Sequence, residues 1–136
     1  MKKTTKIRKR IFALCLALTA FLAMPLTAGA AYSSTTGTLE DYGVCGSLWD
    51  YALYAQAFTE CQEIMATTTV RIDLYFTYGK DIKSTSAIGC NFKATSTKAY
   101  VTDYRYTVYK TISDHCVMLG KDYKWQAGIV SYYNGN

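Results

Sequence analysis

The chain has 136 residues, a formal net charge of +5, 50% hydrophobic and 15% aromatic residues, five cysteines and one proline. Six positive charges fall within residues 2–10, so residues 31–136 hold 15 − 6 = 9 basic against 10 acidic side chains, a net charge of −1. Because residues 31–136 have a net charge of −1, the basic pI of the whole chain does not indicate nucleic-acid binding. The length and composition also exclude an assembly of several domains and a disordered tail protein.

Residues 1–30 have the order of elements that is typical of a secretory signal peptide. A basic segment is followed by the uncharged, apolar residues 11–24 and then by a small-residue stretch that ends at Ala30. We therefore predict cleavage after Ala30, which leaves 136 − 30 = 106 residues beginning at Ala31. The product is expected to be secreted, or held at the cell surface non-covalently, with no membrane contact after signal cleavage.

The remaining chain divides into a short lead-in and one domain. Residues 31–39 are rich in Ser, Thr and Gly, and we expect them to form a flexible lead-in. Residues 40–136 contain no linker, repeat or charge block, so we predict a single domain. Within it, the composition of residues 48–65 favours a helix, whereas their alternation suits a strand. We favour the strand, because the other predicted strands need a partner sheet.

The clearest strand covers residues 68–78, in which apolar and polar side chains alternate. A turn follows at Gly79, where the apolar alternation stops. Residues 86–95 are predicted to form the next strand, with Ile88 and Phe92 on its apolar face.

Two later segments complete the pattern. Alternation over residues 100–112 predicts another strand, and residues 115–119 and 123–132, joined by a turn at Gly120, predict a hairpin. Short strands at a spacing of roughly ten residues are typical of antiparallel sandwiches and barrels. We therefore predict an all-β fold, a small antiparallel two-sheet sandwich of six to seven strands.

Four cysteines follow the signal segment: Cys45, Cys61, Cys90 and Cys116. Because an even number of cysteines in an exported protein favours cross-links, we predict two disulfides; the sequence leaves all three pairings open. Each disulfide would stabilise a domain of this size by about 2–4 kcal/mol. The spacings of 16, 29 and 26 residues contain no CxxC motif, so no zinc site is expected.

The sequence carries no recognisable catalytic, metal or cofactor motif. His115 is the only histidine, so a site with two histidines cannot form within one chain. No G-x-S-x-G, GxGxxG, P-loop or calcium-loop spacing occurs, and the acidic residues show no paired-carboxylate pattern. We interpret His115 as a structural or surface residue, and we predict a protein without enzymatic activity, metal or cofactor.

Tyrosine is the unusual component, with 13 Tyr and 2 Trp in a chain of this length. Tyr75 and Tyr109 fall on polar positions of their strands, where an exposed ring can stack on a sugar or anchor a protein partner. A purely structural role is the alternative, because tyrosine is a strong strand former and aromatic pairs stabilise sheets. We predict Tyr75 and Tyr109 as candidate binding residues.

Three segments carry a resemblance to known proteins: residues 113–133 (SDHCVMLGKDYKWQAGIVSYY), 42–48 (YGVCGSL) and 66–74 (ATTTVRIDL). They resemble small exported β-sandwich proteins of Gram-positive bacteria that have no assigned activity. A more distant similarity is to lactococcin-type bacteriocins, through His115 and a terminal Tyr-Tyr. The chain departs from the bacteriocins in its length and its four mature cysteines, so neither group implies a functional residue here.

These observations predict an exported, non-enzymatic binding module whose ligand is a cell-envelope glycan or a protein partner. Two alternatives stay open: a secreted, bacteriocin-like antimicrobial protein, and a small hydrolase that uses His115 with a carboxylate. No nucleic-acid partner is expected. The free edges of a small sheet also permit self-association.

Overall fold

The structure is a computed structural model that describes residues 31–133. This part of the chain consists of eight β-strands joined by turns and loops, without a helix. The strands are β1 (Ala31–Leu39), β2 (Tyr42–Asp50), β3 (Tyr54–Cys61), β4 (Thr67–Tyr78), β5 (Asp81–Phe92), β6 (Ala94–Tyr100), β7 (Thr107–Leu119) and β8 (Tyr123–Tyr132).

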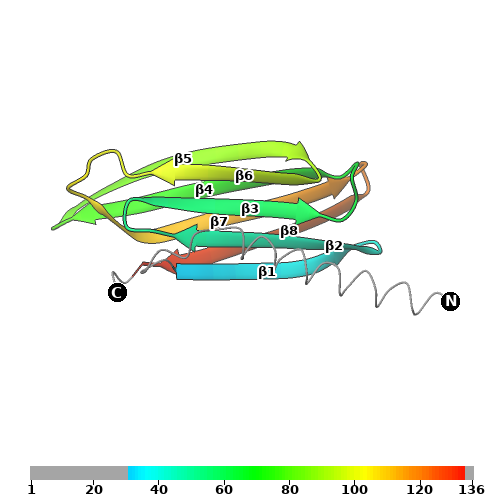
Figure 1. The fold of residues 1–136 in the computed structure, drawn as a ribbon, viewed down its shortest axis with the longest axis horizontal. Coiled ribbons are helices and arrows are strands. Elements are labelled where there is room, and N and C mark those ends of the chain that lie inside the picture. Colours follow the sequence, from blue (N-terminus) through cyan, green and yellow to red (C-terminus); the bar gives the residue numbers. More distant parts are fainter. Residues whose placement is uncertain (1–30, 134–136) are drawn as a thin grey trace.

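The strands form two antiparallel sheets of four strands each, packed face to face (Figure 1). Sheet A has the order β1-β2-β3-β6 and sheet B the order β5-β4-β7-β8. At one edge of the sandwich β1 lies against β8, and at the other edge β6 lies against β5. The all-β, antiparallel two-sheet prediction is confirmed, with eight strands in place of six to seven.

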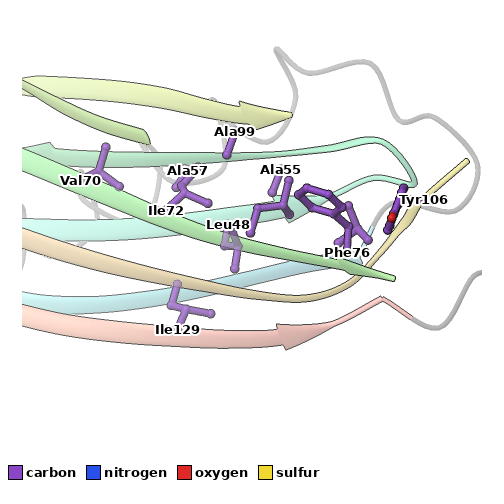
Figure 2. Packing of buried hydrophobic residues seen from close by; sticks show 11 residues of the cluster. Leu48, Ala55, Ala57, Val70, Ile72, Phe76, Ala99, Tyr106 and Ile129 are labelled. Carbon is purple, nitrogen blue, oxygen red and sulfur yellow. The ribbon is translucent and has the colours of Figure 1, made fainter. Parts of the chain in front are cut away.

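The main core lies between the middle of sheet A and strand β4 of sheet B (Figure 2). Strand β4 contributes four large, fully buried side chains at alternate positions, which confirms the strand predicted over residues 68–78. Sheet A faces them mainly with alanine, so small side chains on one sheet accommodate large ones on the other. The cluster includes Leu48, Ala55, Ala57, Val70, Ile72, Leu74, Phe76, Ala99, Tyr106, Val108 and Ile129.

A second, smaller cluster fills the opposite end of the sandwich, around Val44 and Val117. Trp125 of β8 packs beside it and crosses onto β1 at Gly37, where a Cβ atom would lie only 2.2 Å from the indole Nε1. Glycine is therefore required at this position of β1, because any side chain would displace the indole ring that closes this edge.

The expectation of a flexible lead-in at residues 31–39 is wrong. These residues form β1 and pair with β2 along their whole length, from Ala31 opposite Asp50 to Leu39 opposite Tyr42. Threonine is enriched in strands, and every second residue of β1 faces inward. A composition typical of a linker therefore belongs to an edge strand.

The stretch 48–65 confirms the preference for strand over helix, although it is not one strand. It holds the end of β2 and the whole of β3, separated by a turn that the Tyr51 N–H closes on the Tyr54 carbonyl at 2.9 Å. The first half of the strand predicted over residues 100–112 is wrong, because residues 101–106 form a loop. In that loop Arg105 donates to the carboxylate of Asp103, which stabilises a local turn.

Residues 107–119 form one continuous strand, β7, and the predicted turn at Gly120 is confirmed. Gly120 has a φ of 66°, a left-handed conformation that glycine adopts without steric cost. The strand predicted over residues 86–95 is interrupted at Lys93, which has a φ of 63° and moves the chain from β5 in sheet B to β6 in sheet A. Because no glycine or proline marks this crossing, the pattern alone did not indicate it.

The faces of β5 are also the reverse of the prediction. Ile88 and Phe92 are 70% and 64% exposed, whereas Ala87 and Gly89 face β6. A Cβ atom on Gly89 would lie 2.9 Å from the Thr95 hydroxyl oxygen. At this edge the two sheets come so close that only small residues fit inside, and the large apolar side chains lie on the outer surface.

The predicted signal peptide, residues 1–30, lies outside the described residues. In the part of the chain that is described, no helix is long and apolar enough to span a membrane.

Candidate functional site

All but two of the 13 tyrosines lie at one end of the sandwich, the end that carries the β2–β3, β4–β5 and β6–β7 connections (Figure 1). We call this the tyrosine end. The exceptions, Tyr42 and Tyr123, lie at the opposite end beside the β1–β2 and β7–β8 turns. The tyrosine end holds Tyr32, Tyr51, Tyr54, Tyr75, Tyr78, Tyr100, Tyr104, Tyr106, Tyr109, Tyr132 and Tyr133.

The two predicted binding residues come together on the outer face of sheet B. The rings of Tyr75 and Tyr109 meet edge to face, with centroids 6.4 Å apart. Lys110 lies between Tyr75 and Tyr132 in the register of β4, β7 and β8, and its ammonium group is 5.7 and 5.8 Å from their ring centroids. Three tyrosines and one cation thus form a continuous set, which we call the sheet B aromatic group.

A β-bulge produces this arrangement. The register between β4 and β7 shifts between Tyr75 and Phe76, so that Phe76 pairs with Val108 and Tyr75 with Lys110. Tyr109 is the extra residue of the bulge, and the buried Val108 occupies the inner face beside it. Bulges re-aim side chains in this way, and here both Tyr109 and Lys110 are directed outward.

A second aromatic group, which the sequence pattern did not indicate, lies on the outer side of sheet A at the same end. Tyr51 and Tyr54 stack with centroids 4.3 Å apart, and Tyr54 contacts Tyr100 at 5.7 Å. Tyr32 and Trp49 form a further pair at 5.1 Å. Trp49, Tyr51 and Tyr54 fall in the stretch 48–65, and the pairs require the strand register, which the sequence does not supply.

The loops between the two groups are held by Tyr106. Its ring packs edge to face on Phe76 at 5.6 Å, and its hydroxyl donates to the carboxylate of Asp81. Three lysine ammonium groups lie over tyrosine rings at this end of the molecule: Lys83 over Tyr106 (4.5 Å), Lys98 over Tyr54 (5.6 Å) and Lys110 over Tyr75 (5.7 Å).

The charged groups of the tyrosine end favour a positive local potential. Of the acidic side chains there, Asp50 is buried, Asp103 is paired with Arg105 and Asp81 accepts the Tyr106 hydroxyl. Arg105 holds the pKa of Asp103 down, to about 2, through hydrogen bonds to its carboxylate. Cations placed over aromatic rings remain available to anionic ligands, because ring contact does not neutralise their charge.

His115 lies elsewhere, in the core between the sheets, and is 0% exposed. Its Nδ1 is 2.7 Å from the Thr59 hydroxyl, and its Nε2 is 2.8 Å from the Ser113 hydroxyl. Since Thr59 donates its own proton to a backbone carbonyl, its oxygen can accept from Nδ1–H while Ser113 donates to Nε2. Burial lowers the pKa of His115 to about 4, so the ring is neutral near pH 7.

The sequence of β2 makes room for this ring. A Cβ atom at Gly46 would lie 2.5 Å from Cγ of His115, so the position across the core must be glycine. His115 therefore has a structural role in this conformation, which is the first of the two interpretations, structural or surface residue, drawn from the sequence.

The four cysteines are free thiols in this structure, in contrast to the two predicted disulfides. Cys90 and Cys116 both pair with Thr69, one on each side of β4. They are thus two strand spacings apart, about 9.5 Å, which exceeds the limit of about 7 Å between Cα atoms for a disulfide. Cys61 faces the core and Cys45 alternates outward between two inward residues of β2, so their side chains diverge.

In residues 31–133, no three His, Cys, Asp or Glu side chains come together as a possible metal site. Comparison with protein-family models, with curated proteins and with solved structures finds no match.

Proposed function

We propose that the protein is an exported, non-enzymatic binding module that attaches to an anionic cell-envelope glycan through the tyrosine end. The observation that carries this proposal is the sheet B aromatic group, in which Tyr75 and Tyr132 flank the Lys110 ammonium group and Tyr109 contacts Tyr75. Export is expected from the signal sequence.

The chemistry of the group suits sugars. Pyranose rings present apolar C–H faces that stack on tyrosine, while their hydroxyls accept and donate hydrogen bonds with the phenol group. Tyr132 is 59% exposed, and Tyr75 and Tyr109 are partly exposed, so a ligand can reach all three rings. Lys110 supplies the charge that favours a phosphate or carboxylate on the glycan.

The absence of catalysis is part of the proposal. The only histidine is enclosed in the core with both ring nitrogens occupied, so it offers no general base to a ligand at the surface. The tyrosine end lies apart from it and contributes rings and lysines, which bind ligands without activating a nucleophile.

The test is co-sedimentation of the exported protein with insoluble cell walls, comparing wild type with the double variant Tyr75→Ala/Tyr109→Ala. Two lost stacking contacts at about 0.5–1.5 kcal/mol each predict a fall in affinity of roughly 5- to 150-fold. The matched control is Tyr123→Ala, an exposed tyrosine at the opposite end, which is expected to leave binding unchanged.

Two results would contradict the proposal. Equal binding by wild type and the double variant would exclude the sheet B aromatic group, and absence of wild-type binding to walls would exclude a glycan. In the second case a protein partner becomes the ligand to test, using the same variants.

A further inference from the structure

Asp50, at the end of β2, is a buried carboxyl group with no charged partner. It is 0% exposed, and neither of its carboxylate oxygens has a hydrogen bond of normal geometry. The hydroxyl of Thr111 on the facing strand β7 is also buried and unpartnered. The Thr111 and Ser131 hydroxyls lie near enough to lower the pKa of Asp50, but they are neutral, so no positive charge balances the buried carboxylate.

The surroundings of Asp50 supply no charge to offset it. Ser131 of β8 and Thr111 of β7 are the nearest polar groups, and both are neutral hydroxyls that face inward from adjacent positions of sheet B. Burial raises the pKa of Asp50, and these hydroxyls offset part of the rise. A cation at this place would remove the cost of burying the carboxylate.

The strand register places one specific residue beside this carboxyl. Ala31, the first residue of β1, pairs directly with Asp50, and residues paired across two strands share the same face of the sheet. The alternation along β1 makes this the inward face, and β1 lies against β8, which carries Ser131. Ala31 is also the residue that becomes the N-terminus if the signal peptide is cleaved after Ala30.

We propose that Asp50 and Thr111 form a binding site for the new N-terminus that signal cleavage creates at Ala31. Hydrolysis by an export peptidase adds water to the Ala30–Ala31 bond: hydroxyl goes to the Ala30 carbonyl carbon and a proton to the Ala31 nitrogen. The amine takes a further proton from solvent, because its ordinary pKa is about 8. The resulting ammonium group supplies the positive charge that the site lacks, and it has three donors for the oxygens of Asp50 and Thr111.

This pairing links processing to the stability of the sandwich. In the uncleaved chain the Ala31 nitrogen is a neutral amide with one hydrogen, so it cannot neutralise Asp50. After cleavage the ion pair fixes β1 at the edge of sheet A, where the strand is hydrogen-bonded to β2 only. The mature protein is therefore more stable than any form that carries residues before Ala31.

The experiment expresses the full precursor in a bacterial host and isolates the exported product. Mass spectrometry is expected to find Ala31 at its N-terminus, and any other N-terminus overturns the proposal. NMR titration of the α-amino group is then expected to give a pKa well above 8; a value in the ordinary range of about 7.7–8.0 overturns it.

A double-mutant cycle assigns the partner. Inserting two glycines between positions 30 and 31 of the precursor moves the ammonium group away from Asp50, and is expected to reduce the folding equilibrium constant at least about tenfold. In Asp50→Asn the same insertion is expected to have no effect, whereas the control Asp122→Asn, at the exposed β7–β8 turn, keeps the full effect.

Equal losses in wild type and Asp50→Asn, or no loss in either, would overturn the proposal. Should Asp50→Asn fail to fold, the α-amino pKa of the wild-type protein decides the question alone, because a buried ion pair raises it and a solvent-exposed terminus does not.

Discussion

Acidification is expected to destabilise the protein through its single histidine. The imidazole of His115 has a pKa of about 4 in the folded state, against about 6.5 in an unfolded chain. Between these two values the unfolded chain binds a proton that the folded protein does not bind. The stabilising contribution is therefore complete above pH 6.5, decreases as the pH falls, and is lost below pH 4. The difference of about 2.5 pKa units corresponds to about 3 kcal/mol.

The structural reason is that the hydrogen-bond network around the His115 ring cannot accommodate a second ring proton. Thr59 and Ser113 already occupy both nitrogens, and no acidic side chain is bonded to the imidazole. A proton on Nε2 would force the Ser113 hydroxyl to turn and would bury a positive charge. The free energy of unfolding, measured by urea denaturation from pH 7 to pH 4, should follow this protonation.

The control is His115→Gln, whose side chain stays neutral throughout this pH range. Burial raises the pKa values of Asp50 and Glu60, which affects the pH dependence in the opposite direction, but both groups are present in wild type and variant. The difference between the two proteins therefore isolates His115, and should shrink by about 3 kcal/mol on acidification. Parallel curves, or a histidine NMR titration with a midpoint near 6.5, would refute the reasoning.

Three further predictions concern the core and the thiols. Phe76→Ala removes the largest fully buried side chain of the described residues, and should lower the free energy of unfolding by about 3–5 kcal/mol in urea; a loss below 1 kcal/mol would mean that the sheets do not pack as described. Gly46→Ala brings a methyl group to within 2.5 Å of His115, so calorimetry should show a loss of about 1–3 kcal/mol, and unchanged stability would count against this contact. A thiol reagent should modify the exposed Cys90 rapidly and the fully buried Cys61 only on unfolding, and similar rates would contradict their placement.

The sequence was most informative where one strand has one buried face. In β4, alternate residues meet the core on one side and solvent on the other, so the period of two was visible along the whole strand. In β5 the same kind of pattern was misleading, because Ile88 lies outside and the small Gly89 lies inside. That reversal depends on the distance between the sheets at one edge, which is a tertiary property.

The candidate site was predictable in part for a similar reason. Tyr75 stood out because a large aromatic residue occupied a polar position of a clear strand. Its contacts with Tyr109 and Lys110 depend on a bulge and on the pairing of three strands, neither of which leaves a local sequence signal. The gathering of tyrosines from six strands, two connections and the segment after β8 at one end likewise results from topology.

The disulfide prediction followed from the even number of cysteines and the expected export, both of which are properties of composition. Pairing also requires that two side chains share a face and lie within reach. In the register of this structure Thr69 separates Cys90 from Cys116, and no spacing rule could have indicated this.

The most direct test of the central claim is an NMR titration of the isotopically labelled exported protein with soluble, anionic cell-wall glycan fragments. If the tyrosine end binds the glycan, backbone signals of Tyr75, Tyr109 and Lys110 and of the neighbouring β2–β3 and β6–β7 connections should shift together with one affinity. The β1–β2 and β7–β8 turns at the opposite end should stay unchanged. Shifts confined to those turns, or no shifts at millimolar glycan, would contradict the account.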